Sequence, residues 1–177
     1  VISTTVLLSV GISPAAASAG VHIAEIVTTA VSGFSHWRLG NINREVVVRL
    51  LIPGMIGGVV GAYLLTSIPE SITRPIVAIY LMVMGVMILL RAFQHIHAPT
   101  GTVQPTLLGL AGGFFDAIGG GWGPIVTSTM LADGHEPRYT VGSVNLAEFF
   151  VTTAQAATFA LTIGPLIAHN WQIFVGL

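Results

Sequence analysis

One segment decides the fold predicted for this chain: GGFFDAIGGGWGP, from Gly112 to Pro124. It places an acid, Asp116, and a cluster of glycines inside a stretch that is otherwise long and apolar enough to cross a membrane. Clustered glycines interrupt a helix, and irregular backbone at membrane depth persists only where it is buried in protein or lines a watery cavity. We therefore expect a broken membrane helix with a functional site at the break.

The composition places the chain among integral membrane proteins. Hydrophobic residues make up 53% of it and charged residues only 7%, whereas a soluble domain carries about 25% charged residues. The formal net charge of −1 argues against a nucleic-acid partner, which needs a basic face. The absence of cysteine excludes disulfides and thiolate chemistry. The predicted fold class is all-α and polytopic, with the lipid bilayer as a partner.

Segments of about 20 apolar residues divide the chain into membrane spans. We expect complete spans at 15–35, 46–66, 72–93, 105–131 and 139–163, with the glycine break inside the fourth, and partial spans at 1–10 and 171–177. The arginines follow an uneven pattern. Arg38, Arg44, Arg49 and Arg91 fall on one predicted side, and Arg74 and Arg138 on the other. The positive-inside rule then places the first group in the cytoplasm.

An internal repeat links the two ends of the chain. GISPAAASAGVHIAEIVTT from Gly11 matches GHEPRYTVGSVNLAEFFVTT from Gly134, so that Glu25 falls on Glu148. Because the spans listed above put four crossings between the copies, the repeats are expected to share one orientation, about an axis along the membrane normal. We predict duplicated four-helix repeats at 1–103 and 104–177 that form one membrane domain. The parent would have about eight helices, of which this chain lacks the first and the last two.

Polar side chains follow one face of two spans. His22 and Glu25 lie on the first of these spans and Glu148 on the second. A carboxylate at the centre of a membrane helix costs about 2.5–3.5 kcal/mol, so such groups face the interior and are functional by default. We predict that Glu25, Glu148, His22 and Asp116 couple transport to protons or another ion. The alternative is that the acids are protonated and only bond neighbouring helices.

The glycine break predicts an anion site. Pro124 suits the first turn of a helix, so the backbone N–H groups of 120–125 would be free at a helix N-terminus, where anions bind. The alternative for the glycines is a close helix crossing. No cofactor or metal ion is expected. The predicted substrate-binding residues are Gly119, Gly120, Gly121, Trp122, Gly123, Pro124, Ile125, Thr127, Ser143 and Asn145.

The segment GLAGGFFDAIGGGWGPIVT, from Gly109 to Thr127, with the duplicated unit and the Ser143-x-Asn145 helix, resembles the sulfite exporter TauE/SafE family, also grouped as four-transmembrane sulfonate permeases. The resemblance implies a bacterial inner-membrane secondary transporter that exports sulfite, sulfonates or related small anions. Alternatives are a passive anion channel and a membrane subunit without transport activity. An enzyme is not expected, since no P-loop or hydrolase motif is present. Homo-oligomerisation through the glycines of 46–66 is a further alternative.

Overall fold

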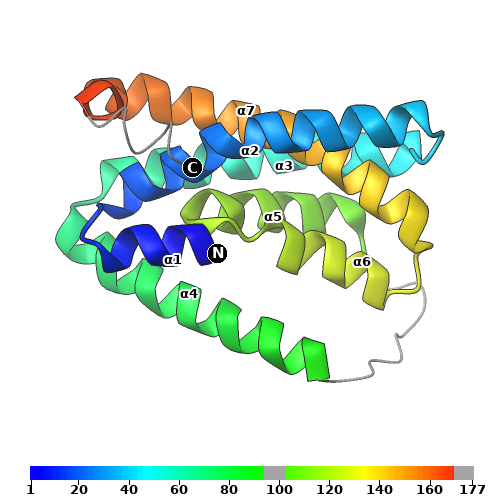
Figure 1. The fold of residues 1–177 in the computed structure, drawn as a ribbon, viewed down its shortest axis with the longest axis horizontal. Helices are drawn as coiled ribbons and strands as arrows, with labels where there is room; N and C mark the ends of the chain where they lie inside the picture. Colours follow the sequence, from blue (N-terminus) through cyan, green and yellow to red (C-terminus); the bar gives the residue numbers. More distant parts are fainter. Residues whose placement is uncertain (94–102, 170–177) are drawn as a thin grey trace.

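The computed structural model describes residues 1–93 and 103–169, and every regular element in these ranges is helical. The helices enclose a short broken element at the centre (Figure 1). In chain order they are α1 (Ile2–Ser9), α2 (Pro14–Arg38), α3 (Arg44–Ser67), α4 (Glu70–Phe93), α5 (Pro105–Gly119), the π-helical turn η1 (Gly123–Thr127), α6 (Ser128–Ala132) and α7 (Pro137–His169).

Local sequence accounts for where the long helices begin. Pro14 is the first residue of α2, and the Ser13 side chain accepts a hydrogen bond from the backbone of the first turn. At α3 the side chain of Asn43 accepts the N–H groups of Glu45 and Val46 at 3.0 and 3.3 Å. Such caps satisfy donors that have no partner inside the helix.

Four helices, α2, α3, α4 and α7, are long and apolar enough to cross a membrane, by length and composition. Their outer faces carry exposed apolar side chains, as expected for contact with lipid, and Ile56, Ile79 and Leu161 are 56%, 58% and 88% exposed. The predicted all-α membrane fold is confirmed. The protein is a multi-pass membrane protein, as its composition predicts.

The segment 105–131 is not a single span, and this corrects the sequence-based topology. Before the break, α5 packs along α3: Gly109 lies against Leu50, and Gly113 lies against Gly54. After the break the chain returns, because Trp122 lies against Gly54 and the side chains of α6 reach the cluster around Leu50.

The two ends of the segment α5–η1–α6 also lie close together. The N–H group of Val103, just before α5, donates to Asp133 Oδ2 just after α6, at 3.4 Å. The segment α5–η1–α6 is therefore a re-entrant hairpin that enters and leaves on the same side. The reversal follows from Gly120, whose φ of 76° lies in the left-handed region that glycine adopts without strain.

The orientation of the repeat is a second correction. Helices α2 and α7 lie side by side and run in opposite directions (Figure 1). Asn145 near the start of α7 bonds Ser32 near the end of α2, and the His22 ring lies 5.9 Å from that of Phe159 further along α7. Between Gly11, where the first matched segment begins, and Gly134, where the second begins, the chain crosses the membrane three times, through α2, α3 and α4. An odd number of crossings inverts the second copy. The copies are thus related as inverted repeats, by an axis in the membrane plane, rather than as parallel ones.

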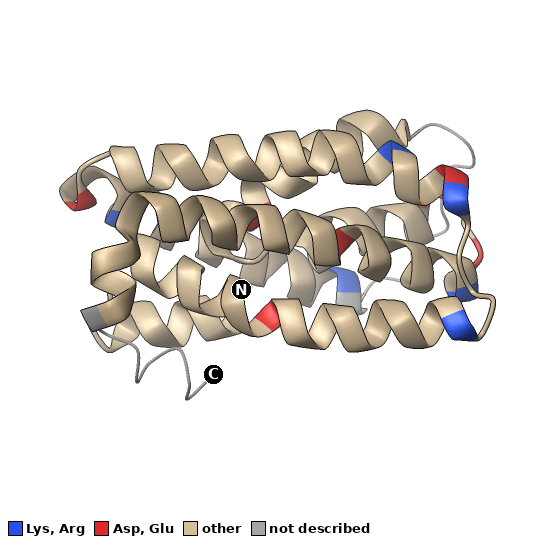
Figure 2. Ribbon diagram, turned by 90° about the horizontal axis from the view of Figure 1, so that it is seen from above, with Lys and Arg blue, Asp and Glu red and all other residues tan. Residues whose placement is uncertain are grey.

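The arginines gather at one end of the molecule (Figure 2). Arg138 belongs to this end, because it donates to Asn41 Oδ1 at 2.5 Å and to the Leu39 carbonyl at 3.4 Å. Arg74 marks the opposite end, where it donates to the carbonyls of Gly11 and Ile12. The sequence-based prediction, which put four arginines on one side of the membrane and two on the other, is therefore wrong in placing Arg138 with Arg74. The positive-inside rule assigns the arginine-rich end, which Arg138 now joins, to the cytoplasm.

The interior core consists of two apolar clusters. One joins Trp122, Val126 and Met130 of the re-entrant hairpin to residues of α3 and α7, and the other includes Ala117 and Phe159. Since α7 packs on α2 and α3, and α5 packs on α3, both predicted repeats contribute to one core. The division at residue 103 stays a prediction.

Candidate functional site

Asp116 organises the break at the tip of the re-entrant hairpin. Its main-chain carbonyl accepts the N–H group of Gly120 at 2.7 Å, and its Oδ1 accepts the N–H group of Trp122 at 2.8 Å. One residue thus binds the chain on both sides of Gly121. The side chain is 1% exposed, so these bonds form away from lipid and water.

Neighbouring helices satisfy the carbonyl groups at the end of α5. These carbonyls form the negative end of the helix dipole, and at a buried helix end they need partners. Two side chains, from α1 and α2, donate to them: Thr4 to Gly119 at 3.2 Å and Ser18 to Ala117 at 2.6 Å. Gln155, from α7, donates to the Gly113 carbonyl further back in α5, at 3.1 Å. The end of α5 is therefore the point at which both repeats meet.

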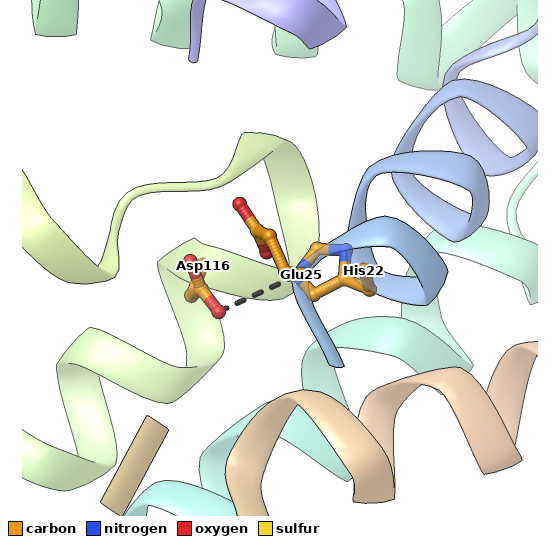
Figure 3. A group of neighbouring side chains, drawn as sticks. All are labelled: His22, Glu25 and Asp116. Carbon is orange, nitrogen blue, oxygen red and sulfur yellow. Dashed lines mark hydrogen bonds and ion pairs between the residues drawn. The ribbon is translucent and has the colours of Figure 1, made fainter. Parts of the chain in front are cut away.

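The four predicted coupling residues lie in this region. Ligand atoms of His22, Glu25 and Asp116 lie within 4.8 Å of one another, and Nε2 of His22 is 3.3 Å from Oδ2 of Asp116 (Figure 3). Glu148, on α7, interacts electrostatically with Asp116 and Glu25. Residues 22 and 25 come from one repeat and residues 116 and 148 from the other, so tertiary packing assembles the group.

The N–H groups of the break are only partly available to an anion. Those of Gly120 and Trp122 donate to Asp116, that of Ile125 donates to the Gly121 carbonyl at 2.9 Å, and Pro124 has none. Among the described residues, no acceptor is found for the N–H groups of Gly121 and Gly123. The predicted row of donors is therefore reduced to two.

Ser143 and Asn145 have partners in other parts of the fold. The Ser143 hydroxyl accepts the N–H group of Asn43 at 2.8 Å, and the Asn145 amide donates to Ser32 at 2.9 Å. Both bonds tie α7 to the other repeat. Thr127, by contrast, lies within η1 and is half-buried.

Two residues at the break were not predicted from the sequence. The hydroxyl of Tyr80, on α4, lies so close to Gly121 that a Cβ added to this glycine would be only 2.1 Å from it. The Tyr80 ring stacks on that of Phe115, with the ring centres 5.8 Å apart. Arg91, near the end of α4, donates to the Pro124 carbonyl at 3.1 Å and to the Ser128 hydroxyl. The arginine could have been found as the cation that follows the uncharged run 75–90 of α4, whereas no local signal distinguishes Tyr80.

Several buried polar atoms around the break lack a hydrogen-bond partner among the described residues. They are Glu25 Oε2, Tyr80 Oη, Trp122 Nε1, Thr152 Oγ1 and Gln155 Oε1. Leaving such an atom unpaired costs about 1–3 kcal/mol, and native proteins retain unpaired groups where water, an ion or a ligand completes them. These unpaired atoms make the region of the break the candidate site.

Known proteins resemble this chain in sequence. Residues 1–177 match the family model described as "Sulfite exporter TauE/SafE". The chain is also 41% identical, over 173 residues, to the "Probable membrane transporter protein YtnM" of Bacillus subtilis (strain 168). That match covers 93% of this chain and 58% of the relative's length. No solved structure matches the chain significantly.

Proposed function

The chain belongs to the sulfite exporter TauE/SafE family, and on that premise we propose that it forms part of a secondary transporter in the bacterial inner membrane. Its substrates are small sulfur-containing anions such as sulfite and organosulfonates, and it moves them outward. The observation that carries this proposal is the broken helix at membrane depth, with buried polar atoms around it that have no partner in the described part of the chain. Such interruptions form the binding sites of many secondary transporters.

The anion binds at the break, beside η1. The N–H groups of Gly121 and Gly123 and the hydroxyls of Tyr80 and Thr127 are the donors we assign to it, because an oxyanion needs several donors once it leaves water. Arg91, which bonds the first residues of η1, supplies positive charge at this point. A guanidinium has further N–H groups with which to bind an oxyanion.

The coupling step uses the carboxyl groups of Glu25 and Glu148, with His22 and Asp116 beside them. These acids come from inverted copies, so that a movement of one copy against the other changes which side of the membrane reaches them. Inverted repeats provide two equivalent conformations of this kind, one open to each side. Alternating access at the interface of α2 and α7 is the mechanism that we infer.

The test measures sulfite flux in proteoliposomes under an imposed proton gradient. Uphill flux is expected with the unchanged protein and is expected to disappear in Glu148→Gln, which keeps the shape of the side chain and removes the titrating group. Glu45→Gln is the matched control, since Glu45 is exposed and pairs with Arg49 on the same helix face. Equal uphill flux in the protein and in Glu148→Gln would refute the coupling role.

A passive anion channel could use the same donors. The unpartnered donors at the break favour anion binding without deciding whether flux is coupled. A channel would pass sulfite only down its gradient, and Glu148→Gln would leave that flux unchanged. The same vesicles, without a proton gradient, therefore separate the two functions.

A further inference from the structure

His22, Glu25 and Asp116 form a compact group of three potential metal ligands. Each offers one nitrogen or oxygen atom, and these atoms lie within 4.8 Å of one another. Figure 3 shows the Glu25 carboxylate beside the line that joins His22 to Asp116. The first two residues are one helical turn apart on α2, and Asp116 reaches them from the end of α5.

The hydrogen bonds of His22 determine which ring nitrogen faces this group. Nδ1 lies 2.7 Å from the carbonyl oxygen of Ser18, an acceptor only, so Nδ1 carries the hydrogen and donates it. In the neutral ring Nε2 then has a free lone pair, and it faces Asp116. Metal-binding histidines are commonly oriented in this way, with the second nitrogen bonded to a backbone carbonyl.

The separation of Nε2 from Asp116 Oδ2 suits two ligands of one ion. At 3.3 Å it is longer than the usual charge-assisted hydrogen bond of about 2.7–2.9 Å. Two ligands placed tetrahedrally at about 2.0–2.1 Å from a zinc ion are about 3.3–3.4 Å apart. With a proton on Nε2 the two groups form an ion pair, and a metal ion bound here would take the place of that proton.

Glu25 completes the group. Its Oε2 is buried and has no hydrogen-bond partner in the described part of the chain. Within that part, no arginine pairs with Glu25 or Asp116. The carbonyl end of α5 adds negative potential at the same place. One buried and one half-buried carboxylate beside a helix C-terminus therefore favour a bound cation.

We propose that His22, Glu25 and Asp116 together bind one divalent first-row transition-metal ion, with zinc as the experimental probe. An imidazole with two carboxylates suits zinc, manganese, iron or cobalt, whereas calcium and magnesium prefer oxygen ligands alone. The site does not depend on the proposed transport activity. Metal and proton would compete for Glu25, so bound zinc is expected to slow proton-coupled flux.

The experiment measures metal content directly in purified, chelator-stripped protein. After equilibration with zinc, about one tightly bound ion per chain is expected, and cobalt in its place should give visible d–d absorption. Glu25→Gln and Asp116→Asn should each weaken zinc binding at least about tenfold. Glu148→Gln, the repeat-related substitution, should retain the ion even if it abolishes coupled flux.

A second control addresses the H-x-H pair His95 and His97, which lies outside the described residues. Zinc that persists in Glu25→Gln but disappears when both of these histidines become asparagine would overturn the proposal. So would a stripped protein that takes up no zinc, or zinc binding by Glu25→Gln and Asp116→Asn as tight as that of the unchanged protein. Because Glu25 Oε2 has no partner to lose, Glu25→Gln is expected to fold normally.

Discussion

At the scale of single residues, the turn depends on Asp116, and the proposed anion site includes Tyr80. Asp116 bonds the chain on either side of Gly121 and also faces His22, so one acid supports both the break and the cation group. The Tyr80 ring is held by Phe115, while its hydroxyl has no partner in the described residues. A rigid ring with a free buried hydroxyl is suited to donate to a ligand.

Replacement of Tyr80 by phenylalanine tests this role. Because the hydroxyl has no partner to lose among the described residues, Tyr80→Phe should leave thermal stability in detergent unchanged or slightly higher. A hydrogen bond to a charged ligand contributes about 1.5–3 kcal/mol, so sulfite affinity should fall about tenfold to a hundredfold. Tyr63→Phe is the control, since Tyr63 is 58% exposed. Unchanged sulfite affinity in Tyr80→Phe would remove Tyr80 from the site.

At the scale of helices, glycines allow α5 to approach α3 closely. A Cβ on Gly113 would lie 2.1 Å from the Gly54 carbonyl oxygen, and one on Gly57 would lie 2.1 Å from that of Leu110. The packing alternative that the sequence left open for such glycines is therefore realised between α3 and α5. Gly120 instead serves the turn, with its positive φ.

Gly113→Ala should therefore loosen the re-entrant hairpin. The added methyl group must push two backbones apart, and overpacking of this kind costs about 1–3 kcal/mol. The free energy of unfolding in detergent micelles is the measurement. Gly85→Ala on α4 is the matched control, because nothing lies within 4 Å of its Cβ position. That substitution should be neutral or stabilise by up to about 1 kcal/mol; equal effects at both positions would contradict the close contact.

At the scale of the whole molecule, the re-entrant hairpin sets the topology. Since it returns to its own side, α7 starts at the end where α2 finishes, and the two repeats are inverted. The arginines agree with this arrangement, because Arg138 joins the arginine-rich end through its bonds to Asn41 and Leu39. A helix that crossed at 105–131 would have left Arg138 on the opposite side.

Cysteine labelling distinguishes these two topologies. The chain contains no cysteine, so single substitutions report on one position each. Leu39→Cys and Glu136→Cys should both resist a membrane-impermeant maleimide in intact cells and react after permeabilisation. Ser67→Cys, at the Arg74 end, should react from outside. If one of the cysteines at 39 and 136 reacts in intact cells and the other does not, the segment 105–131 crosses the membrane once, and the re-entrant hairpin is refuted.

The sequence by itself determined the membrane class and the broken segment, and it named the acids of the proposed site. Apolar runs and scarce charges are read directly from composition, and glycines beside Asp116 interrupt a helix whatever surrounds them. The repeat placed Glu25 and Glu148 at equivalent positions, and the polar faces of their helices indicated the interior. Each of these properties depends on residues close together in the chain.

Only the tertiary structure decided the direction of the chain after the break. A run of apolar residues has the same length whether it crosses the membrane or turns back halfway, so hydropathy alone does not separate the two. Contacts of the hairpin with α3, distant in sequence, select the return path. The same packing brings Tyr80 to Gly121 and His22 to Asp116, because these pairs meet only when helices from different parts of the chain are assembled.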